Sequence, residues 1–281
     1  MICYLPAFIA AIIWSYSILV YRDLSIKTNA LVINIWRLIY SVIFLTLLSI
    51  LFSSSLEDPT GLYFAAISGF FTLGIGDSLY FYSCVYAGAS VATPIIYTYI
   101  ILIQLTATLY GERLTLSKFL ASILAFLGIY LLARKKGDEG KDRIKGIILS
   151  LIAMVMWVIG QTAIKPAVIS TDVINVTLFR ALAGVFTLIV IMRILGVKWV
   201  IEDKSVHVRT SFFGILDIGI GALLYIFSIS LIGLSLTVIL TSLMPLFTQI
   251  LAVATKREKV SYIEFISAIL ILLAIAISIY Y

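Results

Sequence analysis

The sequence predicts an all-α integral membrane protein, with ten transmembrane helices arranged as two inverted five-helix repeats. Of its 281 residues, 62% are apolar and 12% are charged, and the mean hydropathy is +1.16. Soluble globular domains have an apolar share nearer about 45–50%. The apolar residues form runs of about twenty, the length with which a helix crosses a hydrocarbon core of roughly 30 Å. A second copy of the same pattern begins about halfway along the chain.

The duplication is clearest between residues 74–90 and 219–235, which are identical at eight of seventeen positions with an offset of 145. Chance agreement on this scale is not expected, so an internal repeat is indicated. The matches extend through most of the chain: Trp14 with Trp157, Arg22 with Lys165, Arg37 with Arg180, and Gln104 with Gln249. We therefore divide the sequence into a first repeat (1–134), a polar linker (135–143) and a second repeat (144–281).

Ten apolar runs can be assigned to membrane spans. They cover residues 4–21, 30–52, 62–86, 91–110, 116–134, 144–164, 173–195, 209–231, 235–255 and 260–280. Because each repeat holds an odd number of spans, the second repeat enters the membrane from the opposite side. Inverted repeats of this kind are found in many secondary transporters.

The distribution of basic residues agrees with this register. Arg113, Lys118 and Lys165 fall on the face that carries both termini, whereas fifteen other lysines and arginines fall on the opposite face. By the positive-inside rule, this asymmetry predicts a multi-pass plasma-membrane protein with both termini outside. It also argues against nucleic-acid binding as the reason for the net charge of +6. Both cysteines, Cys3 and Cys84, lie in apolar runs and are expected to be buried thiols.

Four ionisable residues lie inside the predicted spans: Arg37, Arg180, Asp77 and Asp217. Charges in a bilayer are costly and commonly functional. Arg37 and Asp77 have nearly the same predicted depth and can form a pair. Asp77 corresponds to Ala222 in the second repeat, so Arg180 lacks the equivalent partner and could bind a carboxylate or phosphate instead. Alternatively, the arginines extend to the interface and the aspartates bond locally.

Polar and aromatic side chains recur along one face of several spans and predict a central cavity. The candidate substrate-binding residues are Trp14, Tyr80, Gln104, Trp157, Gln161, Arg180, Tyr225 and Gln249. Asp77 and Asp217 are candidates for ion coupling. Pro94 and Pro245 each remove a backbone hydrogen bond and are candidate gating hinges. The alternatives are that the polar side chains join neighbouring helices and that the prolines produce only static curvature.

The sequence resembles the EamA-type branch of the drug/metabolite transporter superfamily. The resemblance rests on the two five-helix repeats, a tryptophan in the first helix of each, and Gly111-Glu112-Arg113-Leu114-Thr115 before an apolar span. Residues 254–261 are similar to a second copy of that signature, in which Glu258 matches Glu112 but Arg257 replaces Gly111. The resemblance implies a ligand cavity between the first, third and fourth helices of each repeat, and export or exchange of small metabolites, often amino acids.

Glu112 and Glu258 are predicted to have a structural role at a helix junction, where the helix dipole stabilises a carboxylate. The resemblance implies cytoplasmic termini, whereas the charge count predicts the reverse, and we follow the count.

The sequence therefore predicts a secondary transporter of a small metabolite, embedded in a lipid bilayer as a monomer or homodimer, with proton or sodium coupling and no cofactor. The alternative is a non-transporting membrane subunit or lipid-binding scaffold. An enzyme is not expected, because the single histidine, His207, lies in a polar loop and no nucleophile–base pair or metal-ligand cluster has a recognisable spacing.

Overall fold

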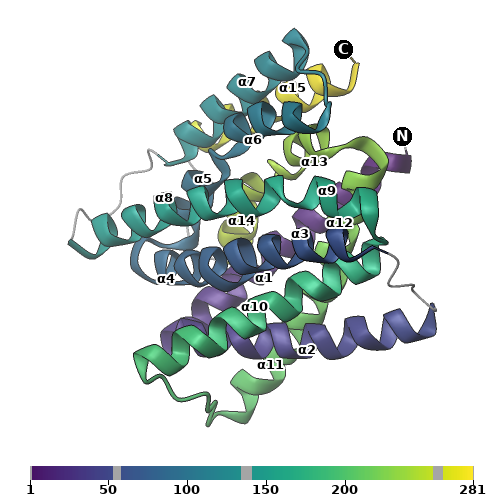
Figure 1. Ribbon diagram of the computed structural model, residues 1–281. Coiled ribbons are helices and arrows are strands. Elements are labelled where there is room, and N and C mark those ends of the chain that lie inside the picture. The colour runs from purple at the N-terminus through teal and green to yellow at the C-terminus, as the bar shows by residue number, and fades with distance from the viewer. Residues whose placement is uncertain (1, 53–57, 134–140, 256–261, 281) are drawn as a thin grey trace.

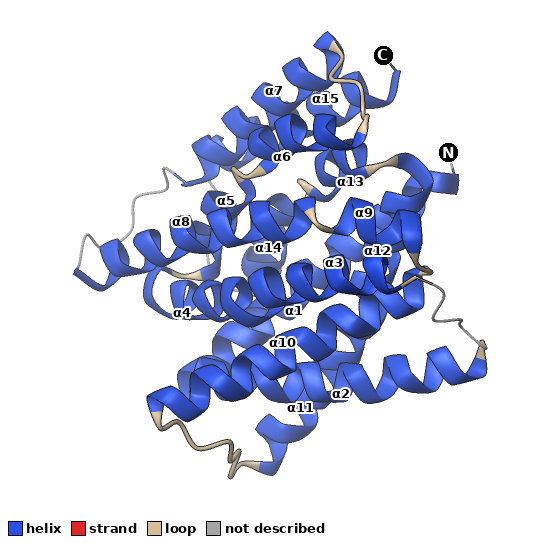
Figure 2. Ribbon diagram, in the orientation of Figure 1, coloured by secondary structure: helices blue, strands red, loops and turns tan. Residues whose placement is uncertain are grey.

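The computed structural model describes residues 2–52, 58–133, 141–255 and 262–280, and every element within them is a helix (Figures 1 and 2). The first part of the chain forms η1 (Ile2–Tyr4), α1 (Leu5–Lys27), α2 (Ala30–Leu51), α3 (Pro59–Gly69), η2 (Phe70–Gly76), α4 (Asp77–Ala87), α5 (Ala89–Tyr97), α6 (Ile100–Ala107), η3 (Thr108–Tyr110) and α7 (Leu116–Ala133). The second part forms α8 (Lys141–Thr162), α9 (Ile164–Ser170), α10 (Val173–Leu195), α11 (Lys204–Gly214), η4 (Ile215–Ala222), α12 (Leu223–Ile232), α13 (Leu234–Thr241), α14 (Met244–Ala254) and α15 (Tyr262–Tyr280).

Eight helical stretches within the described residues are long and apolar enough to cross a membrane. They cover Ile2–Lys27, Ala30–Leu51, Pro59–Ala87, Ala89–Tyr110, Asp142–Ser170, Val173–Leu195, Lys204–Ile232 and Leu234–Ala254. The apolar stretch Leu116–Leu131 of α7 is shorter, and α7 packs along α15 at one end of the bundle (Figure 1). The chain is therefore a multi-pass membrane protein.

Side-chain caps determine where several helices begin, and two spans begin earlier than the sequence pattern predicts. Asn29 and Asp172 accept backbone N–H groups of the first turns of α2 and α10, and Asp58 and Asp203 do the same for α3 and α11. These caps satisfy donors that the first helical turn leaves unpaired. The third and eighth spans consequently begin at Pro59 and Lys204, ahead of the predicted starts at 62 and 209.

Other predicted boundaries also shift. The first span continues to Lys27 instead of ending at 21, and α8 begins at Lys141, inside the predicted linker 135–143. Linker residues 135–140 lie outside the described residues. Cys84 is buried as predicted, but Cys3 is exposed, because it lies in the short helix η1 ahead of α1.

Two of the spans contain a π-helical segment, and two others are broken in the middle. The segments η2 and η4 lie at corresponding places, between α3 and α4 and between α11 and α12. The breaks fall at Thr98–Tyr99, between α5 and α6, and at Ser242–Leu243, between α13 and α14. Pro94 lies just before the first break and Pro245 just after the second. Unusual backbone of this kind is tolerated in a membrane protein where the surrounding protein satisfies it.

The distribution of side chains is that expected in a bilayer. Large apolar residues such as Ile50, Phe186 and Ile194 are exposed on the outside, whereas Arg37, Asp77, Arg180 and Asp217 are buried.

Four close backbone approaches join the two halves. A Cβ added at Gly69 would lie 2.0 Å from the carbonyl oxygen of Arg180, and one at Gly214 would lie 2.5 Å from that of Arg37. Added at Gly76 and Gly221, it would meet the indoles of Trp157 and Trp14 at 2.6 and 2.9 Å. Glycine therefore brings each arginine-bearing and tryptophan-bearing helix against the other half.

Candidate functional site

A central cavity lies where the two halves meet. The centres of water-sized molecules can occupy about 60 Å³ of it. One water molecule needs about 10–15 Å³ of such space. The cavity is therefore large enough for several water molecules or a small polar group. Its wall combines aromatic, charged and apolar side chains: Trp14, Ser17, Ile18, Tyr21, Arg37, Thr72, Leu73, Asp77, Tyr80, Phe81, Trp157, Gln161, Arg180, Asp217, Ile218, Ala222, Tyr225 and Met244.

Arg37 of α2 is neutralised by two carboxylates. One guanidinium nitrogen donates to Asp77 of α4 and another to Asp217 of η4, forming a buried three-residue ion cluster. Nε donates to the side-chain oxygen of Asn34 at 2.8 Å. The predicted pair of Arg37 and Asp77 is thus present, and Asp217 joins it from the other half of the chain. Burial of this arginine is tolerable because carboxylates and hydrogen bonds surround it.

Aromatic rings cover the rest of that guanidinium. Its central carbon lies 4.6 Å from the ring centroid of Phe81 and 5.2 Å from that of Tyr21. These two rings stack on each other with a centroid distance of 4.9 Å. Cation–π contacts of this kind are strongest away from water. All of these contacts hold Arg37 in one place at the cavity wall.

Two tryptophans orient the acidic residues from opposite sides. The indole N–H of Trp157 donates to Asp77 Oδ1 at 3.0 Å, and that of Trp14 donates to the main-chain carbonyl of Asp217 at 3.2 Å. Each indole can approach closely because its neighbour is a glycine of a π-helical segment. Trp157 packs on Gly76 of η2, and Trp14 packs on Gly221 of η4. π-Helical turns are frequent at functional sites.

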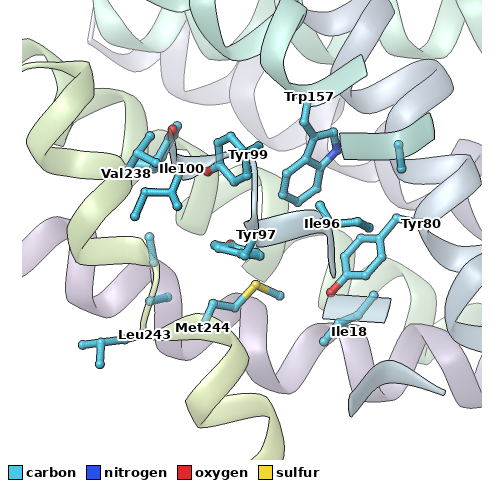
Figure 3. Packing of buried hydrophobic residues seen from close by; sticks show 14 of the residues in the cluster. Ile18, Tyr80, Ile96, Tyr97, Tyr99, Ile100, Trp157, Val238, Leu243 and Met244 are labelled. Atoms are coloured by element: carbon cyan, nitrogen blue, oxygen red, sulfur yellow. The ribbon is translucent and has the colours of Figure 1, made fainter. Parts of the chain in front are cut away.

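An aromatic cluster extends from Trp157 toward the broken span α5–α6 (Figure 3). The Trp157 ring lies 5.6 Å from Tyr80, 5.9 Å from Tyr97 and 5.8 Å from Tyr99, all in edge-to-face geometry. The Tyr80 hydroxyl bonds to that of Thr93 at 2.6 Å. On the other side of the cavity Trp14 lies 5.1 Å from Tyr225. Rings on both sides give the cavity walls a rigid shape.

Arg180 of α10 is buried in a different environment. Its Nε donates to Ser68 Oγ at 2.8 Å and one Nη donates to Thr72 Oγ1 at 3.3 Å. Within the described residues no carboxylate forms an ion pair with it. The side chain lines the cavity and is 3% exposed. Among the described residues, its side-chain hydrogen-bond partners are therefore hydroxyl groups.

The structure brings together most of the candidate binding and coupling residues. Eight of them line the cavity: Trp14, Asp77, Tyr80, Trp157, Gln161, Arg180, Asp217 and Tyr225. Gln104 and Gln249 lie elsewhere. Gln104 donates to the Ser235 carbonyl at 3.2 Å and accepts the Ser235 hydroxyl, and Gln249 donates to the Ser90 carbonyl at 3.3 Å. Each therefore joins the two broken spans to one another.

The contact of Gln249 has a clear cause. Pro94 has no N–H to donate to the carbonyl four residues earlier, which belongs to Ser90. The Gln249 amide occupies that acceptor instead. Pro94 and Pro245 lie beside the helix breaks outside the cavity lining, where a change in helix angle would tilt its walls.

Several cavity residues were not among the candidate binding residues. The sequence pattern indicates Arg37 only as an intramembrane charge. It does not single out Ser17, Tyr21 or Thr72, which also line the cavity. The spacing of Trp14, Ser17, Ile18 and Tyr21 places them on one helical face, a signal that was available in the sequence. Thr72 corresponds to Asp217 at the repeat offset of 145, but its contact with Arg180 of another helix is visible only in the structure.

Glu112 joins the halves near one end of the bundle. Its carboxylate accepts the N–H groups of Leu234 at 2.6 Å and Ser235 at 2.9 Å, and it pairs with Lys165 Nζ at 3.2 Å. The predicted role at a helix junction is therefore present, but the helix that it caps is α13 of the other half. Gly111, with φ of +79°, makes the tight turn that precedes it. Glu258 and Arg257 of the second signature lie outside the described residues.

Comparisons with known proteins agree with this architecture. An uncharacterized transporter of Archaeoglobus fulgidus is 24% identical over 270 residues, which cover 95% of this chain and 94% of that protein. A solved crystal structure has the same fold, with a TM-score of 0.78 at 19% identity, over 98% of this chain and 95% of the other. The model of the EamA-like transporter family matches twice, at residues 1–134 and 144–280. Because those matches cover nearly the whole sequence, the chain belongs to the EamA-like transporter family.

Proposed function

We propose that this protein is a secondary transporter that moves a small polar metabolite, such as an amino acid, by alternating access. The observation that carries the proposal is the cavity, which is lined by rings, hydroxyl groups and charges from both halves. Small-molecule sites commonly combine such walls with a few polar groups that orient the ligand. The family and the Archaeoglobus relative point to a transporter rather than an enzyme.

The proposal includes ten spans in two inverted repeats, with α7 and α15 as the fifth span of each. The two family matches and the corresponding π-helical segments support this arrangement. Transport would tilt the halves against each other about the cavity, with the helix breaks near Pro94 and Pro245 absorbing the change. The basic residues favour a plasma-membrane orientation with both termini outside.

The test is counterflow in liposomes, using a panel of radiolabelled amino acids, sugars and organic cations. We expect at least one solute to exchange, and Trp157→Ala to reduce its exchange by about tenfold or more, because the indole holds Asp77 and the surrounding rings. Trp199→Phe is the matched control, since Trp199 lies outside the cavity lining and is 38% exposed. Folded protein that exchanges no solute but binds lipid or a partner protein would support the alternative of a non-transporting subunit or scaffold.

Asp77 and Asp217 are the proposed coupling residues, because a carboxylate that alternates between Arg37 and a proton can link ion and solute movement. Exchange driven by a proton gradient should lose its pH dependence in Asp77→Asn or Asp217→Asn. If uptake keeps the same pH profile in both variants, these carboxylates do not couple transport to protons. Replacing the proton gradient with a sodium gradient tests the other ion.

A further inference from the structure

Resting on the transport function proposed above, we propose that Arg180 binds an oxyanion group of the solute, either a carboxylate or a phosphate. Arg180 provides the fixed positive charge, and the bound group takes the place of the carboxylates that this arginine lacks. The site therefore selects solutes with an anionic end over neutral solutes of the same shape.

The two buried arginines of the cavity differ in their partners. Arg37 and Arg180 occupy corresponding positions in the two halves, at an offset of 143. Both are 3% exposed and both line the cavity. Arg37 pairs with two carboxylates, whereas Arg180 contacts the hydroxyl groups of Ser68 and Thr72. The same residue type, equally buried, thus pairs with carboxylates in one half and forms no ion pair with a described residue in the other.

The difference follows from the residues at corresponding positions of the two halves. The carboxylates around Arg37 come from positions 77 and 217, which correspond at an offset of 145 to Ala222 and Thr72. Thr72 contacts Arg180 through its hydroxyl group, just as Asp217 contacts Arg37 through its carboxylate. Both positions that correspond to the carboxylates around Arg37 are therefore uncharged, and both line the cavity.

The Arg180 guanidinium has more hydrogen-bond donors than its two hydroxyl partners occupy. The guanidinium has five N–H donors, of which Ser68 and Thr72 occupy two. Arginine binds carboxylate and phosphate oxygens with two parallel bonds, and such bonds are strong where water is excluded. Cavity side chains with unused hydrogen-bonding capacity can hold the rest of a small solute, because Ser17 Oγ and Gln161 Oε1 are buried without a partner among the described residues.

The experiment compares acids with amides in which an uncharged group replaces the carboxylate. The full-length protein in liposomes is given propionate and propionamide, L-lactate and L-lactamide, L-alanine and L-alaninamide, and inorganic phosphate. Binding is measured by thermal stabilisation and transport by counterflow. We expect at least one acid to bind about 10- to 100-fold more tightly than its amide, the range for losing charge-assisted hydrogen bonds. The carboxylate and phosphate arms identify which oxyanion the site prefers.

Variants at Thr72 and Arg180 test the assignment of the site. Thr72→Asp should supply the missing carboxylate and weaken acid binding by about tenfold or more, whereas Thr72→Asn, of similar size and uncharged, should weaken it clearly less. Arg180→Gln should remove the difference between acid and amide. Thermal unfolding of each variant shows whether it is folded.

The inference fails if no oxyanion binds to the folded protein, if amides bind as tightly as acids, if Arg180→Gln keeps the preference, or if Thr72→Asp and Thr72→Asn behave alike. Its failure is separable from that of transport. Exchange of neutral or cationic solutes alone would keep the transport function and reject the anion site. Binding of acids that depends on Arg180, without movement across the membrane, would keep the site and reject transport.

Discussion

At the scale of single residues, the cavity contains two positive and two negative side chains in an uneven arrangement. Asp77 and Asp217 both contact Arg37, so the negative charges gather on one side and Arg180 stands apart. A buried ion cluster contributes little net stability when complete, but removing one member leaves uncompensated charge. Arg37 therefore holds the acidic residues of both halves together.

This arrangement predicts that Arg37→Met destabilises the protein by about 3–5 kcal/mol, because two carboxylates lose their shared counter-charge. The triple variant with Asp77→Asn and Asp217→Asn should recover much of that loss, since no buried charge is then unpaired. Unfolding midpoints in detergent measure both effects. A single variant as stable as the wild type would show that the cluster does not hold the halves together.

At the scale of elements, contact between helices depends on glycines whose positions correspond in the two halves. The cost of a methyl group differs with the neighbour that it meets. At Gly69 the neighbour is main chain, the carbonyl of Arg180, whereas at Gly74 it is the side chain of Thr187 at 2.6 Å. Rotation of Thr187 moves its Cγ2 but not its Cβ, which would lie 2.7 Å from the added methyl group. Both substitutions therefore require a helix to shift in a packed bundle, and the shift is larger at Gly69, where the overlap is deeper.

We therefore expect Gly69→Ala to destabilise the protein by about 1–3 kcal/mol or more, and Gly74→Ala to cost less. The comparison uses the same substitution five residues further along the same span. The melting temperatures of the two variants and of the wild type measure which substitution costs more stability. A Gly69→Ala variant that melts at the wild-type temperature would mean that α10 can move away from α3 at little cost, and equal losses in the two variants would contradict the predicted order.

A second element-scale feature is the carboxylate cap on α13. Glu112 accepts two main-chain N–H groups, whereas Lys165 contributes a partly exposed ion pair. We expect Glu112→Ala to cost about 1–2 kcal/mol, the range for losing a helix cap, and Lys165→Ala to cost about 1 kcal/mol or less. Unfolding measurements on both variants check the order. If Lys165→Ala is the more damaging change, the ion pair and not the cap is what stabilises this junction.

At the scale of the whole molecule, the proposed inversion places corresponding loops on opposite sides of the membrane. Lys27, at the end of α1, and Ile169, near the end of α9, are both exposed and lie at corresponding ends of the first span of each half.

In a background lacking Cys3 and Cys84, Lys27→Cys and Ile169→Cys should react with a membrane-impermeant thiol reagent from opposite sides of sealed vesicles. Inside-out and right-side-out vesicles provide the matched comparison and also give the absolute orientation. Labelling of both positions from one side would contradict the inverted arrangement, whatever solute the protein carries.

The sequence by itself determined the membrane class, the duplication, and the position of each polar residue along its own helix. Apolar run length and helical rise carry that information, which is why the pairing of Arg37 with Asp77 could be predicted from depth alone. The tryptophans and tyrosines at corresponding positions, Trp14 with Trp157 and Tyr80 with Tyr225, were recognisable for the same reason.

Only the tertiary structure decided which helices face each other. Asp217 reaches Arg37 across the interface between the halves, and Gln104 and Gln249 turn toward the partner span instead of the cavity. Periodicity gives depth and face along one helix but not the rotation of its neighbours, which depends on close approaches at Gly69, Gly76, Gly214 and Gly221. The missing partner of Arg180 at position 222 is readable from the repeat, whereas its contacts with Ser68 and Thr72 are a property of the folded chain.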